Sequence, residues 1–392
     1  MRTLIVSDLH LGSVSGADVL RRAELRAPLV EAASSADRVV LLGDVLELRH
    51  GPLREAMAAA RPIFEDLGRV LAGRELIITA GNHDHALVEP WLAARGEEER
   101  PPPLGLEQLL EPADASPALA RIAGWAAPAH VRVAYPGLWL RPDVYATHGH
   151  YLDCHLTVPT LERLSVGAMS RLLGRPALTF SSVDDYESVG APVFAWRDAV
   201  ARDARTSDAL NGVATVAAWR ALRGRGRDER GGRDGARGLA ARDEANGLGA
   251  AALRLRRRAL VGAFPVAVAA LNRAGLGPLH ADISASELRR AGLAAMGEVA
   301  ARLGLGDAYV VFGHTHRAGP LPGDDPGDWV GGGGARLVNA GNWTYSDVFL
   351  ASTGRQSPYW PGTCVLVEDA GPPVVEALLQ DRTPADVRPS QA

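Results

Sequence analysis

The sequence contains no lysine, and only two of its 392 residues are cysteines, Cys154 and Cys364. Two cysteines cannot provide the disulfide framework of a small secreted domain. Aromatic residues make up only 5% of the chain, and no apolar run reaches the roughly 18 residues that a membrane-spanning helix needs. We therefore expect neither a disulfide-stabilised fold nor a membrane-spanning helix, and we interpret Cys154 as a small buried residue.

The chain also lacks a surplus of either charge. Its 42 basic side chains, all of them arginine, nearly balance the 46 acidic ones, and the formal net charge is −4. Dedicated nucleic-acid binders need a clear basic surplus to contact phosphates, so a nucleic-acid partner is not expected. Polar residues interrupt the apolar run in the opening MRTLIVSDLH, which is not the ordinary form of a signal peptide. We expect a cytoplasmic protein.

Short apolar, β-branched runs alternate with helical stretches in the first third of the chain. Residues 19–35 and 53–72 are rich in Ala, Leu, Arg and Glu, which favours helices. Such alternation is typical of βαβ units in an α/β fold. Residues 335–379 are punctuated by Gly and Pro and predict antiparallel strands, including 336–338 and 363–367. Further strands are predicted at 3–6, 39–42, 76–79, 144–147 and 309–312.

The middle of the chain, residues 156–302, has a mostly helical composition and predicts an insertion or cap. Within it, residues 223–249 form a low-complexity stretch of Arg, Gly, Asp and Ala that predicts a flexible loop. Arginines in 254–258 precede an apolar run at 260–271. This run predicts either a buried helix of the cap or a weak contact with a membrane surface. Residues 383–392 predict a loose tail.

Polar residues of the types that bind metal ions follow five of the predicted strands. Ligands of α/β sheets gather beyond the carboxyl ends of the strands, so these residues can converge on one site. Most of the 11 histidines lie in or next to these motifs. The motifs are Asp8-Leu9-His10, Gly43-Asp44-Val45-Leu46-Glu47, Gly81-Asn82-His83-Asp84, His148-Gly149-His150 and Gly313-His314-Thr315-His316.

The spacing within these motifs bears on how the side chains meet. Asp8 and His10 are two positions apart, so in an extended chain both point to the same side. His314 and His316 repeat this spacing. Oxygen and nitrogen donors without a thiolate suit Mn, Fe or Zn. The sequence therefore predicts a metal centre built from the ends of several strands.

As a set, the motifs resemble those of the calcineurin-like metallophosphoesterase superfamily, over about residues 1–155 and 305–345. The resemblance implies an α/β fold in which two mixed β-sheets pack as a sandwich flanked by helices. It implies a core of residues 1–155 and 303–382, with the helical insertion between them. The fold class, the core and the position of the insertion are thus expectations for the structure.

The resemblance also implies two adjacent divalent metal ions, with Mn expected first and Fe, Zn or Mg as alternatives. Asp44 would bridge the two ions. His83 matches the catalytic histidine of the superfamily, and Asp84 matches the partner that orients it. The first ion would be held by Asp8, His10, Asp44 and His316, and the second by Asp44, Asn82, His148 and His314.

The function implied is metal-dependent hydrolysis of a phosphate ester or pyrophosphate bond by a hydroxide between the two ions. His83 would act as general acid or as a stabiliser of the phosphate. Two alternatives stay open, a catalytically weak scaffold and a nuclease on the same fold. A scaffold would be expected to lose ligands, whereas every ligand position is filled here. A nuclease fits poorly with the net charge of −4.

Departures from the superfamily motifs limit the substrate. Glu47-Leu48-Arg49 and Asp84 replace residues of the protein Ser/Thr phosphatases, so that branch is not expected. The bacterial UDP-2,3-diacylglucosamine hydrolases are similar in Gly-Asp-x-x-Glu and in a helical insertion, but they carry Arg where this chain has His83. We expect a phosphorylated small molecule or lipid as substrate.

A few residues near the motifs have two interpretations. His85 and His150 either support the metal ligands or lie in exposed loops. The segment Asn339-Ala340-Gly341-Asn342-Trp343 either closes the sheet next to the site or forms a turn with a core tryptophan.

Overall fold

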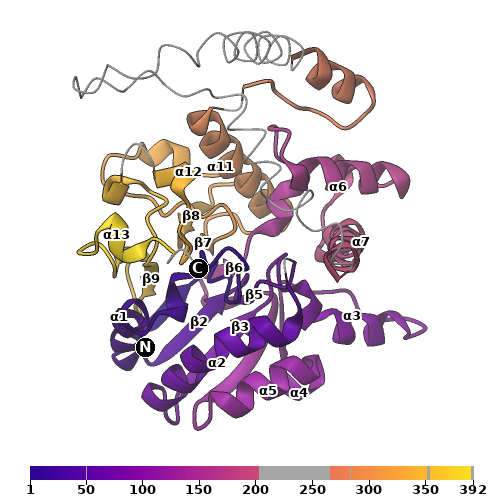
Figure 1. The fold of residues 1–392 in the computed structure, drawn as a ribbon. Helices are drawn as coiled ribbons and strands as arrows, with labels where there is room; N and C mark the ends of the chain where they lie inside the picture. Colours follow the sequence, from indigo (N-terminus) through magenta and orange to yellow (C-terminus); the bar gives the residue numbers. More distant parts are fainter. Residues whose placement is uncertain (50, 203–264, 283, 351–353, 390–392) are drawn as a thin grey trace, which may run out of the picture.

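The computed structural model describes residues 1–49, 51–202, 265–282, 284–350 and 354–389 (Figure 1). The predicted flexible loop at 223–249 and the arginines of 254–258 lie outside these residues. The described chain is a mixed α/β structure in which ten strands form one large mixed sheet covered by helices. The α/β class is therefore as predicted.

The strands run in the order β10-β9-β1-β2-β3-β5-β6-β7-β8 across the sheet, and β4 pairs with β5 outside this path. All seven strands predicted from the sequence are present, whereas β4, β5 and β10 were not predicted. The bounds are β1 (Thr3–Val6), β2 (Arg38–Leu42), β3 (Glu75–Thr79), β4 (Glu107–Leu110), β5 (His130–Arg141), β6 (Val144–Thr147), β7 (Tyr309–Phe312), β8 (Arg336–Asn339), β9 (Thr363–Val367) and β10 (Val374–Ala377).

Two parallel blocks of strands make up most of this sheet. Strands β1, β2, β3 and β5 are parallel to one another, and so are β6, β7 and β8. The long strand β5 joins the blocks, because it pairs parallel to β3 through its first half and antiparallel to β6 through its second half. The antiparallel prediction holds for β9, which pairs with β1, but is wrong for β8. Residues 313–335 form a crossover rather than a hairpin, which brings β8 back parallel to β7.

Helices cover the sheet on two sides (Figure 1). Helix α2 begins and ends close to the predicted bounds, and its buried residues Ala56, Ala60, Ile63, Phe64 and Leu67 recur at helical spacing and pack on the sheet. The bounds are α1 (Ala23–Ser34), α2 (Leu53–Val70), α3 (Glu89–Gly96), α4 (Pro112–Ala115), α5 (Pro117–Trp125), α6 (Leu161–Leu172), α7 (Val183–Arg202), α11 (Ala285–Arg302), α12 (Asp347–Leu350) and α13 (Pro384–Val387).

The hydrophobic core has three parts. One lies under α1, α2 and α5, and a second lies among α6, α7, α11 and the strands next to them. The third consists almost entirely of strand residues from both parallel blocks, for example Ile5 and Val40 from one block and Val144, Val311 and Val338 from the other. Strand residues of both blocks therefore contribute to one apolar cluster.

The prediction of a loose tail at 383–392 is wrong for the residues that the structure describes. Thr383 and Asp386 form a capping box at the start of α13, where Pro384 favours a helical first turn. Val387 is buried, and the guanidinium of Arg22 donates hydrogen bonds to the carbonyls of Val387 at 2.8 Å and Arg388 at 3.2 Å. These contacts fix the segment against the start of α1.

The predicted insertion, residues 156–302, contributes α6, α7 and α11, which lie together on the upper side of the molecule in Figure 1, away from α2, α4 and α5. None of its described residues belongs to the sheet. Of the apolar run at 260–271, the structure describes 265–271 as helical, with Val268 buried and Val266 68% exposed. This part is therefore not a buried core helix. Among the described helices, none is both long and apolar enough to cross a membrane.

A buried carboxylate holds the cap on the core. Glu187 of α7 accepts hydrogen bonds from the hydroxyls of Tyr135 at 2.6 Å and Tyr151 at 2.5 Å, and its Oε2 lies 3.3 Å from His85 Nε2. Burial raises the pKa of Glu187, but the hydrogen bond and charge of His85 and the two hydroxyls outweigh it, so the pKa is lowered. An ionised carboxylate with three donors therefore fixes α7 to β5 and to the segment after β6.

We predict that Glu187→Ala lowers the free energy of unfolding by roughly 2–5 kcal/mol, because each buried hydroxyl left without its acceptor costs about 1–3 kcal/mol. Denaturant titration measures the loss, and hydrogen exchange should place it in α7. Ser188→Ala is the control, since Ser188 Oγ bonds only the carbonyl of Asp185 within the same helix among the described residues. Equal stability of the two variants would contradict this role of Glu187.

Candidate metal centre

The residues predicted as metal ligands lie in the loops that follow β1, β2, β3, β6 and β7, and the structure brings them together in one cluster. Among the described residues, all of the predicted ligands except Asn82 belong to three groups that are compact enough to hold a metal ion, and His83, which was predicted as catalytic, is a member of one of them. The groups are Asp8, His10 and His316; His10, Asp44 and His83; and Asp44, His148 and His314.

Asp44 belongs to two of these groups, one with His10 and His83 and the other with His148 and His314. Its Oδ2 is 3.3 Å from His148 Nε2 and 3.6 Å from His10 Nε2. On one side, Asp8 Oδ1 lies 3.2 Å from His316 Nε2 and 3.8 Å from His10 Nε2. The carboxylate of Asp44 therefore faces two halves of the centre. The first half contains Asp8, His10 and His316, and the second contains Asn82, His148 and His314.

Asn82 completes the second half. Its Oδ1 lies 3.1 Å from both His148 Nε2 and His314 Nδ1. Turning the amide by 180° would instead point the oxygen at the guanidinium of Arg49, at 3.0–3.1 Å, and the nitrogen at Asp44 and the two imidazoles. The inward oxygen is favourable when a cation lies among these acceptors, and the outward oxygen is favourable when none does.

Each ligand histidine has its outer ring nitrogen held by an acceptor. His10 Nδ1 lies 3.0 Å from Glu47 Oε2, and His148 Nδ1 lies 3.0 Å from the carbonyl of Leu42. An N–H donated outward leaves the inner nitrogen with its lone pair directed into the centre, which is the tautomer that a metal ion needs.

The same arrangement recurs at the two histidines after β7. His314 Nε2 lies 3.1 Å from Asp153 Oδ1, and its Nδ1 faces Asn82. His316 Nδ1 lies 3.4 Å from the hydroxyl of Thr344, and its Nε2 faces Asp8. Asp153, in the segment between β6 and the cap, thus supports His314.

The backbone at these positions is unusual. Asp8, His10, Asp44, His314 and His316 all have φ between 45° and 64°, and only one other described non-glycine residue, Asp307, has a positive φ. The extended geometry assumed for Asp8 with His10 and for His314 with His316 is therefore wrong. The left-handed backbone conformation makes the chain turn sharply after each of these strands. As a result, His316 joins the group of Asp8, whereas His314 joins the group of Asp44 and His148. Such residues cost about 1–3 kcal/mol each and concentrate at functional sites.

The electrostatics of the centre fit a cation. Asp8 and Asp44 are 0% and 1% exposed, and Asp8 Oδ1 has no hydrogen-bond donor among the described residues. Burial raises the pKa of Asp44, but the charges of His148 and His83 outweigh it and hold the pKa well below its usual value. Burial lowers the pKa of His148, but Asp44 outweighs it and raises that pKa to about 9. Protons on the histidines thus supply the positive charge that a metal ion would supply in their place.

His83 lies beside the centre and is oriented by Glu47. Its Nδ1 lies 2.9 and 3.0 Å from the two oxygens of Glu47, and its backbone N–H donates to Asp44 Oδ1 at 2.7 Å. Burial lowers the pKa of His83 to about 4, with Arg49 lowering it further and Glu47 acting against both. The neutral ring donates from Nδ1 to Glu47.

Asp84 does not have the position implied for it. Its Oδ2 accepts hydrogen bonds from the backbone N–H groups of Val45 at 2.7 Å and Leu46 at 3.1 Å, and its Oδ1 accepts from Gly81 at 2.7 Å. Within the described chain, no hydrogen bond joins Asp84 to the His83 ring. Asp84 therefore ties the loop after β3 to the loop after β2, and the part of orienting partner falls to Glu47.

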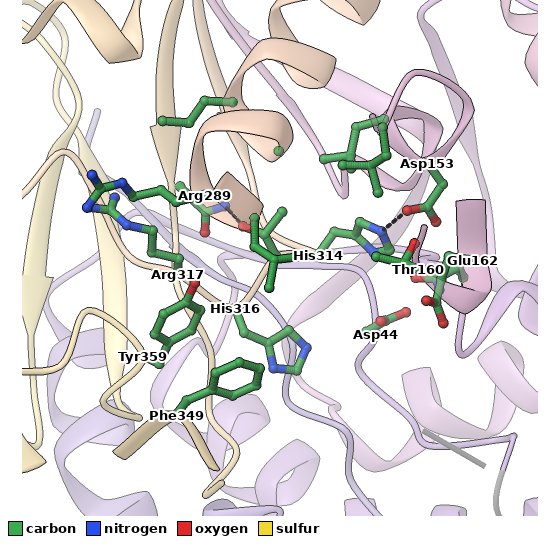
Figure 2. Close-up of a pocket in the computed structure, with 18 of the residues that line it drawn as sticks. Asp44, Asp153, Thr160, Glu162, Arg289, His314, His316, Arg317, Phe349 and Tyr359 are labelled. Carbon is green, nitrogen blue, oxygen red and sulfur yellow. Dashed lines mark hydrogen bonds and ion pairs between the residues drawn. The ribbon is translucent and has the colours of Figure 1, made fainter. Parts of the chain in front are cut away.

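A pocket of about 350 Å³ opens onto the centre. Asp44, Asn82, His83, His314 and His316 line its inner part, and Figure 2 shows His314 and His316 directed into it. The cap supplies other walls through α6 and α11. The volume lies in the range of small-molecule sites, so the centre is accessible to a small ligand under the cap.

The residues with two interpretations are now placed. His85 and His150 are both 3% exposed, so neither lies in a solvent-exposed loop. His85 contacts Glu187, whereas neither ring nitrogen of His150 has a hydrogen-bond partner among the described residues.

The segment 339–343 combines both of its interpretations. Asn339 ends β8 and lines the pocket, and Trp343 is buried in the core, where its indole N–H donates to the carbonyl of Thr363. Cys154 is buried, as predicted.

We predict that Asp44→Asn weakens metal binding in both halves of the centre, because Asp44 is the carboxylate between them. Elemental analysis of protein equilibrated with Mn²⁺ should give clearly less metal per chain than wild type. Asp66→Asn makes the same change at a partly exposed carboxylate of α2 and should retain wild-type metal content. Undiminished metal in Asp44→Asn would overturn the arrangement.

Asp84 and Glu47 are separated by a second pair of variants. Asp84→Asn should lower the free energy of unfolding by about 1–3 kcal/mol, because an amide cannot accept all three backbone hydrogen bonds. Its turnover per folded molecule should stay close to that of wild type. Glu47→Gln should instead lower metal affinity or turnover by about 10–100-fold, the usual cost of removing a residue that supports a ligand. The reverse pattern would show that Asp84 orients His83.

No family model matches the chain, and no curated protein matches it. The motifs and the geometry of the centre are therefore what point to a function.

Proposed function

We propose that the protein is a binuclear metal-dependent hydrolase of phosphate ester or pyrophosphate bonds, of the kind found among calcineurin-like metallophosphoesterases. The observation that carries the proposal is the position of Asp44 between two compact Asp/His groups, with His83 lining the same pocket. A scaffold that only binds partners would have no need for five strained ligand residues with oriented imidazoles.

The arrangement of the sheet also supports this proposal. We infer that the two parallel blocks, which share β5, correspond to the two mixed sheets of the metallophosphoesterase sandwich. In support, strand residues of both blocks belong to one apolar cluster, and ligand loops from both blocks contribute side chains to the same groups, such as Asp8 with His316. The hydrogen-bonded continuity through β5 makes the two layers one sheet in topology.

We propose that the first metal ion is held by Asp8, His10, Asp44 and His316, and the second by Asp44, Asn82, His148 and His314. The all-oxygen-and-nitrogen donor set suits Mn²⁺ first, with Fe, Zn or Mg as alternatives. When bound, two such ions lower the pKa of water to near neutrality and neutralise charge on a phosphoryl group.

The protein's own residues have distinct tasks in the proposed reaction. Hydrolysis breaks the bond between phosphorus and the leaving oxygen as a bond to the water oxygen forms, and the leaving oxygen must gain a proton. Glu47 orients the His83 ring through Nδ1, and the ring lines the pocket that would take the substrate. An anionic phosphate beside the ring raises its pKa, so His83 can carry the proton that it gives to the leaving oxygen or share it with the phosphate.

The size of the pocket bears on the substrate. A volume of about 350 Å³ suits a phosphorylated small molecule or the head group of a lipid. The direct test is a substrate panel on Mn²⁺-loaded protein, with phosphomonoesters, phosphodiesters, nucleoside diphosphates and phospholipids compared at equal concentration. Hydrolysis that disappears with a chelator and returns with Mn²⁺ supports the proposal, and no hydrolysis of any member contradicts it.

We predict that His83→Asn lowers turnover by roughly 10²–10⁴-fold, the range for a positioned acid or base. Metal content should stay near that of wild type, because His83 is assigned no metal bond. His130→Asn at the exposed start of β5 is the control and should change neither quantity. Loss of metal in His83→Asn would show that the imidazole is a ligand, and an unchanged rate would exclude a catalytic role.

A further inference from the structure

The pocket extends from the metal centre to a pair of arginines that the proposed hydrolysis does not use. Arg289 lies on α11 and Arg317 directly follows His316, and both line the pocket. Figure 2 shows their guanidinium groups together on one side, with Asp44, Asp153 and Glu162 on the other. The charges of both arginines act on the same two groups, Asp324 and Tyr359.

This pair carries more positive charge than its surroundings neutralise. Arg317 is 4% exposed, stacks over the Trp329 ring at 4.9 Å, and pairs through Nη2 with Asp324 Oδ1 at 2.5 Å. Its Nε has no hydrogen-bond partner in the described chain, and Arg289 forms no ion pair there. Of the two guanidinium groups, only that of Arg317 is paired with a carboxylate in the described chain. The pair of arginines therefore leaves a net positive charge at this end of the pocket.

The walls near the arginines are apolar. Leu288 and Leu293 of α11 line the pocket with Arg289, and Trp329 lies under the guanidinium of Arg317. A strongly hydrated substituent is unfavourable along these walls, whereas an alkyl or aromatic segment buries its surface there.

The opposite side of the centre has its charges matched in pairs. Glu162 pairs with Arg197 at 3.1 Å, and Asp153 lies 3.1 Å from His314, so both carboxylates there already have positive partners. These pairs offer a second negative group on the substrate no comparable excess of positive charge, so such a group would be attracted to the arginine side. The charge distribution therefore gives a bound phosphoester one preferred direction.

We propose that Arg289 and Arg317 form a second anion-binding subsite, and that the substrate is a phosphoester carrying another anionic group beyond a short apolar segment. This inference rests on the proposed phosphoesterase function and names the class of its substrate. The metal centre binds the scissile phosphate, the leucines and Trp329 contact the apolar segment, and the arginines bind the distal carboxylate, sulfate or phosphate.

The test uses 4-nitrophenyl phosphodiesters whose second ester group is an alkyl chain of increasing length ending in a carboxylate. Each is compared with its uncharged methyl ester. Hydrolysis replaces the bond between phosphorus and the nitrophenolate oxygen by one to water oxygen, and released 4-nitrophenol is measured. At the chain length that spans the pocket, kcat/KM for the carboxylate should exceed that for the methyl ester by about 10–100-fold, mainly through KM.

Variants connect this preference to the arginines. Arg289→Gln should bring the ratio of the two kcat/KM values close to one, mainly by lowering kcat/KM for the carboxylate. Arg290→Gln is the matched control, because Arg290 is the next residue of α11, pairs with Glu287 and does not line the pocket. Arg317→Lys keeps the charge of the more buried arginine and should keep part of the preference. Equal rates for both series in wild type, or a preference unchanged in Arg289→Gln, would overturn the subsite.

A binding measurement separates this inference from the proposed function. If no phosphoester is hydrolysed, the phosphoesterase proposal fails, and calorimetry with the corresponding non-hydrolysable phosphonates still tests the subsite. Tighter binding of the carboxylate than of the methyl ester in wild type, lost in Arg289→Gln and kept in Arg290→Gln, supports it. Equal affinities of the two phosphonates for wild type exclude it.

Discussion

Two carboxylates inside the protein, those of Asp8 and Asp44, impose the constraint on which the site depends. Both are almost completely buried, and a buried negative charge needs positive charge within a few ångströms. Four imidazoles surround them, each oriented by an outer acceptor, so that either a proton or a cation can occupy the inner side. The left-handed turns at the strand ends are the backbone cost of bringing these groups so close.

Much of this site could be predicted from the sequence, because its ligands directly follow buried strands whose apolar runs are easy to recognise. Asp44 follows β2 and His148 follows β6, which belong to different parallel blocks, so their meeting depends on how β5 joins the two blocks. The local geometry could not be predicted in the same way. The spacing of Asp8 and His10 indicated an extended chain, whereas tertiary contacts impose positive φ at both residues. Glu47 and Asp153 act through side-chain contacts with residues distant in sequence, which no local pattern specifies.

The parts of the fold that sequence patterns missed have similar causes. Strand β5 contains Pro136 and Gly137, which normally argue against a central strand, and it tolerates them where it passes from β3 to β6. The order of strands after β7 depends on a crossover whose path the composition does not indicate. Residues 383–389, the described part of the predicted tail, contact the core because Arg22, more than 300 positions earlier, donates to the carbonyls of Val387 and Arg388.

The carboxylate of Glu47 serves two imidazoles at once, those of His10 and His83. A metal ion on the inner nitrogen of His10 strengthens the hydrogen bond from His10 to Glu47, and protonation of His83 strengthens the one from His83. Both rings bond the same carboxylate, so the two events are coupled. By thermodynamic reciprocity, metal binding at His10 changes the free energy of protonating His83 by the same amount as protonation of His83 changes the free energy of metal binding. Substitutions at these three positions are thus expected to be non-additive, and evolution could alter the metal preference of the centre and the acidity of its nearest imidazole only together.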